Sequence, residues 1–303
     1  MHIRKFEKSG EHFSHTTYES VSDAMHYYNQ LKTKEIRMSQ SSNQSKIDEY
    51  TGGSRHEMSW TGFTSEEQFQ QVMRDGDLPK AKEIWAMPSP NIMVESIRRK
   101  SRMGECGDSL DVQRYLMSEF DKCWRSTYKR KAKGGTRNIT LLADIAGNCG
   151  ITSAELGWRG LSTLKIADVL CEAGYSVRVL CYDYAVGDCV GIQHNSLVTT
   201  VIKDFDEGMD VTKLASIICS AGYFRTVGFC SIVSMADNQG VQASGGLGSS
   251  KHLDEGDWKA RFMRETCFDG EGDLYPIPIV KNQDQANKAM SDVLKHFGIE
   301  EDS

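Results

Sequence analysis

The amino-acid sequence predicts an α/β fold, in which a mostly parallel sheet carries helices on both faces and contains one antiparallel strand. From residue 137 onward, apolar strand-like runs alternate with helical patterns. Residues 184–195 contain no periodic pattern long enough for a helix. We therefore expect the strands on either side of them to form an antiparallel hairpin. Before residue 137 the chain is polar and weakly periodic, which indicates a partly helical, partly flexible N-terminal region.

Within that N-terminal region, two stretches favour helices. Residues 18–31 are amphipathic, and Ser20 or Ser22 is the expected cap. A second helix begins after Thr64, has Glu67 three residues later as in a capping box, and stops at Gly76.

The Ser-, Gln- and Gly-rich stretch 37–55 predicts a flexible linker between these two helices. We therefore expect three parts: a polar, partly disordered segment (1–55), a helical region (56–136) and an α/β domain (137–303).

The α/β domain opens with an apolar strand at 138–143 that ends at Asp144. Leucines and alanines at helical spacing predict a helix at 161–174. The run 175–183 is apolar on both faces, as central strands of covered sheets are. The remaining expected elements are strands at 196–206, 224–237 and 274–280 and helices at 210–222 and 283–298.

Composition indicates a cytoplasmic protein, in the host cytoplasm if it is viral. The charged start of the chain predicts no signal peptide, and no apolar run approaches the roughly 20 residues that span a bilayer. The nine cysteines form no C-x-x-C pair, which favours reduced thiols. The net charge of −6 gives no general preference for nucleic acid or membranes.

The order of elements, with Asp144 at the end of the first strand, resembles a von Willebrand factor A (VWA) domain. A helix begins after the sequence EGMD, where VWA domains place a Gly-Gly-Thr turn, and Asp237 ends the expected fourth strand, where they place a second aspartate. Segments 107–124 and 201–229 are similar to a family of phage and bacterial proteins that has a VWA-like domain with a degenerate metal-ion-dependent adhesion site. The resemblance spans about residues 58–300.

The resemblance implies a three-layer, Rossmann-like domain with a rim where oxygen ligands converge. The ligand positions of the family correspond here to Asp144, Ala146, Asn148, Asp210 and Asp237. Ala146 has no ligating atom, whereas the other four have the oxygens that suit Mg²⁺. Two interpretations stay open: these four residues bind Mg²⁺, or Asp144 caps backbone N–H groups in the turn and no metal binds.

A catalytic role is not expected, because the sequence has neither a phosphate-binding P-loop motif nor a G-x-S-x-G elbow. We expect a non-enzymatic binding or adaptor protein, of phage origin by the resemblance. Its partner would be a protein, an AAA+ ATPase or a polymerase, held at the carboxyl-terminal rim of the sheet.

A basic segment supports a second hypothesis, in which the chain binds single-stranded nucleic acid in phage replication or transcription. Cations that follow phosphates and aromatic rings that stack on bases are what such binding needs. A second basic run at 96–103 would extend the patch. The residues of the main segment are Trp124, Arg125, Tyr128, Lys129, Arg130, Lys131, Lys133 and Arg137.

Overall fold

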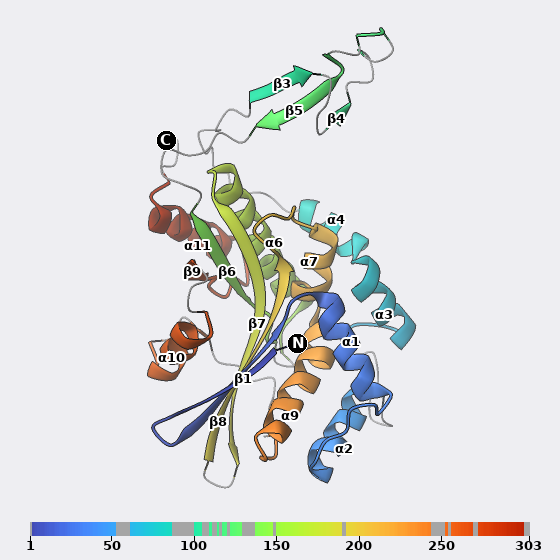
Figure 1. Ribbon diagram of the computed structural model, residues 1–303, viewed down its shortest axis with the longest axis vertical. Helices are drawn as coiled ribbons and strands as arrows, with labels where there is room; N and C mark the ends of the chain where they lie inside the picture. Colours follow the sequence, from blue (N-terminus) through green and yellow to red (C-terminus); the bar gives the residue numbers. More distant parts are fainter. Residues whose placement is uncertain are drawn as a thin grey trace.

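A six-stranded mixed sheet forms the centre of the molecule, with the strand order β1-β2-β8-β7-β6-β9 (Figure 1). The computed structural model describes residues 2–52, 61–86, 100–104, 109–110, 114, 117–119, 122–128, 137–147, 150–189, 192–243, 252–253, 256–268 and 272–299. The strands of the sheet are β1 (His2–Lys8), β2 (Glu11–Tyr18), β6 (Asn138–Asp144), β7 (Ser176–Cys189), β8 (Ile192–Lys203) and β9 (Asp273–Pro276).

Helices cover both faces of this sheet, which confirms the predicted α/β class. The pairs β2–β8, β7–β6 and β6–β9 are parallel, whereas β1–β2 and the predicted hairpin β7–β8 are antiparallel. The helices are α1 (Val21–Lys32), α2 (Ser41–Tyr50), α3 (Glu66–Asp75), α4 (Leu78–Ala86), α6 (Ser153–Glu172), α7 (Val211–Ile218), α8 (Ala221–Tyr223), the π-helix η3 (Phe224–Gly228), α9 (Phe229–Asn238), α10 (Trp258–Cys267) and α11 (Gln283–Phe297).

The two faces of the sheet bury separate apolar clusters because side chains alternate along each strand. On β6, Leu141 and Ala143 belong to the cluster that also contains residues of α6, α7 and α9, while Leu142 belongs to the other cluster. That second cluster contains Tyr182, Tyr184 and the buried face of α10. The central strands are therefore covered on both sides, as the apolar run at 175–183 predicted.

The prediction of a fourth strand at 224–237 is wrong, because this stretch is helical. It forms η3 and then α9, and every residue from Phe229 to Asp237 is buried. A helix buried on all sides shows no polar face, so its sequence reads like an apolar strand. The C-terminal helix is confirmed as α11. The fifth strand is present as β9 but ends at Pro276, so residues 277–280 are not part of it.

The N-terminal region contributes to the main sheet, which differs from the expected boundary at residue 137. Strand β2 pairs in parallel with β8, and β1 extends the sheet beyond it. Ser20 caps α1 as expected, by accepting a hydrogen bond from the Asp23 N–H. The second predicted helix is α3, which Ser65 caps in place of Thr64 and which ends at Gly76.

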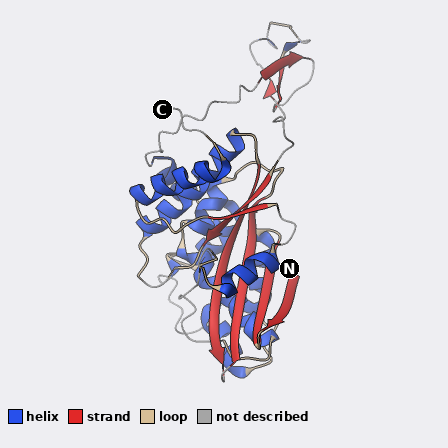
Figure 2. Ribbon diagram, turned by 90° about the vertical axis from the view of Figure 1, so that its left-hand side faces the viewer, coloured by secondary structure: helices blue, strands red, loops and turns tan. Residues whose placement is uncertain are grey.

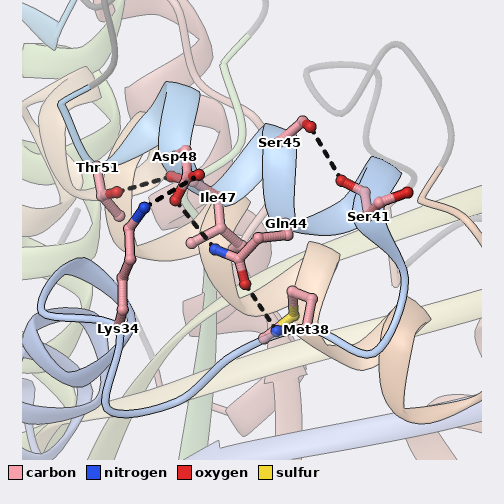
Figure 3. A network of polar contacts seen from close by, with 8 residues as sticks. All are labelled: Lys34, Met38, Ser41, Gln44, Ser45, Ile47, Asp48 and Thr51. Carbon is pink, nitrogen blue, oxygen red and sulfur yellow. Dashed lines mark hydrogen bonds and ion pairs between the residues drawn. The ribbon is translucent and has the colours of Figure 1, made fainter.

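The predicted linker at 37–55 instead holds helix α2, whose polar contacts are drawn in Figure 3. The Met38 N–H donates to Gln44 Oε1 at 2.9 Å, and Gln44 Nε2 donates to Asp48 Oδ1 at 3.0 Å (Figure 3). Ile47 is fully buried in the main core. Tertiary contacts, among them the burial of Ile47, therefore outweigh the linker-like composition.

A second, three-stranded sheet has the order β3-β5-β4 and is drawn apart from the main sheet in both views (Figures 1 and 2). Its strands are β3 (Lys100–Gly104), β4 (Ser109–Leu110) and β5 (Trp124–Tyr128). Both neighbouring pairs in it are antiparallel.

Among the described residues, no single helix has the length and apolarity to cross a membrane; only the pair Val211–Ile218 and Ala221–Asn238, bent by 57°, passes that test together. Six cysteines in the described part of the chain are free thiols: Cys123, Cys171, Cys181, Cys219, Cys230 and Cys267. Burial raises the pKa of Cys181 and of Cys219 to about 12, so both stay protonated and unreactive near neutral pH.

Candidate functional site

The turn that follows β6 contains Asp144, the first residue of the expected rim. Its side chain is 2% exposed. Its Oδ1 accepts a hydrogen bond of 2.7 Å from the Ala146 N–H. Asp144 therefore caps the turn, as one of the two sequence-based interpretations required.

Two basic side chains from outside the turn hold it in place. Arg159 of α6, which is buried, donates from Nη1 to the carbonyl oxygens of Asp144 and Ala146 at 3.0 and 2.7 Å. His252 Nδ1 lies 2.6 Å from Asp144 Oδ2. The His252 side chain is 29% exposed, so it is the part of this cluster that reaches solvent.

Asp183 is a second buried carboxyl on the neighbouring strand, one residue beyond the register partner of Asp144. It is fully buried, and neither carboxyl oxygen has a hydrogen-bond partner among the described residues. A Cβ added to Gly228 of η3 would lie 3.7 Å from Asp183 Oδ2, which places this carboxyl against the π-helix. Burial, and then the negative charge of Asp144, raises the pKa of Asp183 well above its usual value.

Asp210 serves as the N-cap of α7. Its Oδ1 accepts hydrogen bonds from the N–H groups of Thr212 and Lys213 and from the Thr212 hydroxyl. Burial alone would raise the pKa of Asp210, but these hydrogen bonds lower it below its usual value. Its oxygens therefore satisfy the start of its own helix.

Asp237 lies near the end of α9, not at the end of a strand. Its Oδ2 accepts from the Ser39 N–H at 2.7 Å, and its Oδ1 accepts from the Gln40 N–H and the Asn43 amide at 3.0 Å each. This carboxylate fixes the segment before α2 to the end of α9.

The residues expected to bind Mg²⁺ do not form a metal site in the part of the chain that the structure describes. Asp144 is engaged by Ala146 and His252, while Asp210 and Asp237 cap separate segments. No group of three or more His, Cys, Asp or Glu side chains in the described ranges is arranged to hold a metal ion. Asn148 lies outside those ranges.

Replacing Asp237 with asparagine is expected to destabilise the fold at neutral pH by about 1–3 kcal/mol, because two backbone N–H groups lose a charged acceptor. Burial alone would raise the pKa of Asp237, but the hydrogen bonds from Ser39, Gln40 and Asn43 lower it. A lowered native pKa stabilises above the unfolded value of 3.8, and this stabilisation is lost as the pH falls below it.

The measurement is urea denaturation between pH 3 and pH 7, with the exposed Asp206→Asn as control. The loss in Asp237→Asn should shrink toward low pH. A loss that stays equal at all pH values would contradict the assigned role of the carboxylate.

The two basic runs of the sequence meet in the three-stranded sheet. Strand β3 pairs with β5 in antiparallel register, with Lys100 opposite Tyr128 and Arg102 opposite Ser126. Residues directly opposite each other share a face, as do residues two apart. By register, Lys100, Arg102, Trp124 and Tyr128 therefore belong to one face, which we call the cation–aromatic face.

The other residues expected to bind nucleic acid are not assigned to this face. By register Arg125 lies opposite Met103, on the reverse face of the sheet. Arg137 forms an ion pair of 3.0 Å with Asp273 beside the main sheet. The remaining ones, Lys129, Arg130, Lys131 and Lys133, lie outside the described residues.

Sequence reasoning missed three groups around the turn: Arg159, Asp183 and His252. Asp183 had a detectable signal, because it is a lone acid in an otherwise apolar strand run. His252 had none, since its distance to Asp144 depends on tertiary structure alone. The face assignment in β3 and β5 required the register.

Comparison with models of protein families gives a match over most of the chain. The model of a domain of unknown function, DUF7192, matches residues 7–301, so the chain belongs to this family. Neither the curated proteins nor the solved structures contain a significant match to the chain.

Proposed function

We propose that this chain, as a member of the DUF7192 family, is a non-enzymatic protein that binds single-stranded nucleic acid. The binding surface would be the cation–aromatic face of β3 and β5 together with the adjoining basic segment 129–133. The register of β3 on β5 carries this proposal, because it brings two basic runs that are separate in sequence onto adjacent strands.

The residue types on this face suit a single strand with no fixed sequence. Lysine and arginine neutralise phosphates, and Trp124 and Tyr128 offer flat rings for base stacking. Base faces are free to stack on aromatic side chains only in a single strand, because in a duplex they are stacked on one another. We therefore expect a preference for single strands over duplexes of equal charge.

The test is fluorescence anisotropy with a labelled 30-nucleotide single strand at several salt concentrations. Wild-type protein should bind with an affinity that falls steeply as salt rises. Changing Lys129, Arg130 and Lys131 to Glu should abolish binding, because three attractive charges become repulsive. A control that changes the exposed Arg261, Lys288 and Lys295 to Glu has the same charge change and should keep most of the affinity.

No binding at low salt would end this proposal. Equal loss in the control variant would also contradict it, since binding would then depend on net charge and not on this surface.

The second candidate is an adaptor for a protein partner, an AAA+ ATPase or a polymerase, at the turn after β6. The observation that favours it is the partly exposed His252, which contacts Asp144 at the turn that Arg159 also holds. The order β6-α6-β7-β8-α7 supports a variant VWA-like fold, in which a buried helix replaces the fourth strand. A phage origin belongs to the same proposal.

Affinity capture from the native host tests the adaptor proposal. An ATPase or a polymerase should be recovered with the wild-type protein and lost with His252→Ala. The exposed His2→Ala, which removes a histidine paired with Glu19, is the matched control. Recovery of nucleic acid alone would rule out this candidate.

A further inference from the structure

A pocket of about 480 Å³ lies beside the start of α6, where α3, α4 and the α7–α8 turn meet it. Its volume falls in the range of small-molecule sites. It is also close in sequence to the turn after β6, and open α/β sheets bind ligands beyond the carboxyl ends of their strands. None of the residues expected from the sequence to bind a ligand lines this pocket.

The pocket has both apolar and polar walls. Phe63, Val72, Ile151 and Leu156 belong to the apolar part. The ring of Phe63 lies so close to Gly222 that a Cβ there would be 2.0 Å from it. Phe63 also packs edge-on against Phe69, with ring centroids 5.5 Å apart. The cavity is therefore held open by the packed core around it.

A second close approach involves Gly76, which also lines the pocket. Gly76 has φ +84°, a conformation that side chains rarely adopt, and a Cβ there would lie 2.2 Å from Thr212 Oγ1. The Asp77 N–H then donates to the Thr212 carbonyl at 2.9 Å. Helices α4 and α7 are thereby joined at the rim of the pocket.

Two cations from different elements face this pocket. Lys80 of α4 has only 17% of its side chain exposed, and its Nζ donates to Ser153 Oγ at 3.0 Å and to Glu83 at 2.8 Å. Arg225 of η3 is half-buried and also lines the pocket. Glu83 is 65% exposed, and pairs of this kind are weak, so an anion can compete with it for Lys80.

The charge balance of the lining favours an anion. Lys80 and Arg225 contribute two positive charges, and Asp77 is the single acid among the lining residues. One oxygen of Asp77 already accepts the Lys80 N–H at the start of α4. The hydroxyls of Ser153 and Ser220 add polar groups beside the cations.

We propose that this pocket binds a small organic anion, with its phosphate or carboxylate between Lys80 and Arg225 and its apolar body against Phe63 and Ile151. Guanidinium and ammonium groups recognise such anions by charge-assisted hydrogen bonds. The site is separate from the cation–aromatic face, so it is independent of the proposed nucleic-acid binding.

The probes are phenyl phosphate, benzoate, inorganic phosphate and neutral phenol, measured by isothermal titration calorimetry with the full chain. Phenyl phosphate should bind saturably, at least about tenfold more tightly than inorganic phosphate, because its ring leaves water for an apolar wall. Phenol should not bind measurably. Benzoate tells whether a carboxylate replaces the phosphate.

Lys80→Gln and Arg225→Gln should each weaken phenyl phosphate binding about tenfold or more. Arg225→Lys should keep part of the affinity, and Lys82→Gln, an exposed lysine on the same helix, should keep all of it. If Lys80→Gln does not fold, the proposal is tested by the two Arg225 variants and by the comparison of phenyl phosphate with phenol. Absence of saturable anion binding, equal binding of phenol, or unchanged affinity in folded Lys80 and Arg225 variants would overturn the proposal.

Discussion

Asp183→Asn is expected to stabilise the protein at neutral pH, and the gain should increase as the pH rises. The native carboxyl is fully buried, has no hydrogen-bond partner among the described residues and feels the charge of Asp144. Asparagine has nearly the same shape but no charge to bury. The variant therefore gains the free energy that the wild type loses by burying an unpaired carboxyl group at this position.

The sign follows from proton linkage. Because the native pKa of Asp183 is raised above its usual 3.8, the folded state holds a proton that the unfolded state releases. The raised pKa of Asp183 therefore stabilises the folded state fully below pH 3.8. This stabilisation is lost as the pH rises toward the native pKa. Over that window the wild type loses about 1.4 kcal/mol per pH unit relative to Asp183→Asn.

Urea denaturation of both proteins at pH 5, 6, 7 and 8 measures this difference. Asp206→Asn, which removes an exposed carboxyl, should show no such trend. A constant destabilisation by Asp183→Asn at every pH would contradict the account, because it would mean that the native carboxylate is ionised and has a partner.

Single-strand binding is expected to depend on one face of the β3–β5 pair. Arg102→Gln should remove a phosphate contact, and Tyr128→Ala should remove a stacking surface worth about 1–3 kcal/mol. Together these changes should weaken binding about 30-fold or more at low salt, because each interaction contributes at least about 1 kcal/mol. The loss of one cation should also reduce the salt dependence by about 0.7 in slope.

The reverse face supplies the matched control. By register, Arg125 and Thr127 lie opposite Met103 and Ser101, so Arg125→Gln with Thr127→Ala removes the same charge from the reverse face of the same strand pair. That variant should bind nearly as well as the wild type. Similar losses of affinity in both double variants would contradict the face assignment. Binding would then depend on the basic charge of the sheet and not on one face of it.

The sequence was sufficient for the part of the fold in which local pattern and tertiary environment agree. The hairpin β7–β8 follows from a connection too short for a helix, and α11 follows from a clear amphipathic repeat. The segment 224–237 could not be assigned correctly because a fully buried helix has no polar face to reveal its period.

Long-range partners explain the other differences. Strand β2 pairs with β8, whose residues lie 182 positions further along the chain, and no local pattern reveals this partner. The polar segment around α2 is ordered because Asp237 accepts hydrogen bonds from Ser39, Gln40 and Asn43.

The candidate sites show the same limit. Asp144 was found because a polar residue ends an apolar strand, and its role as a turn cap was one of the two expected outcomes. The convergence of Asp210 and Asp237 on it depended on the misassigned strand. The proximity of two basic runs was anticipated from composition, but the face that each residue occupies required the pairing of β3 with β5.

Photo-cross-linking tests the central proposal most directly. The full chain would be irradiated with a single strand containing 4-thiothymidine, and the linked peptides would be identified by mass spectrometry. We predict cross-links at Trp124 or Tyr128 and in the segment 129–133, which high salt abolishes. Cross-links confined to the main sheet and its helices, or none at low salt, would contradict the proposal that this face binds nucleic acid.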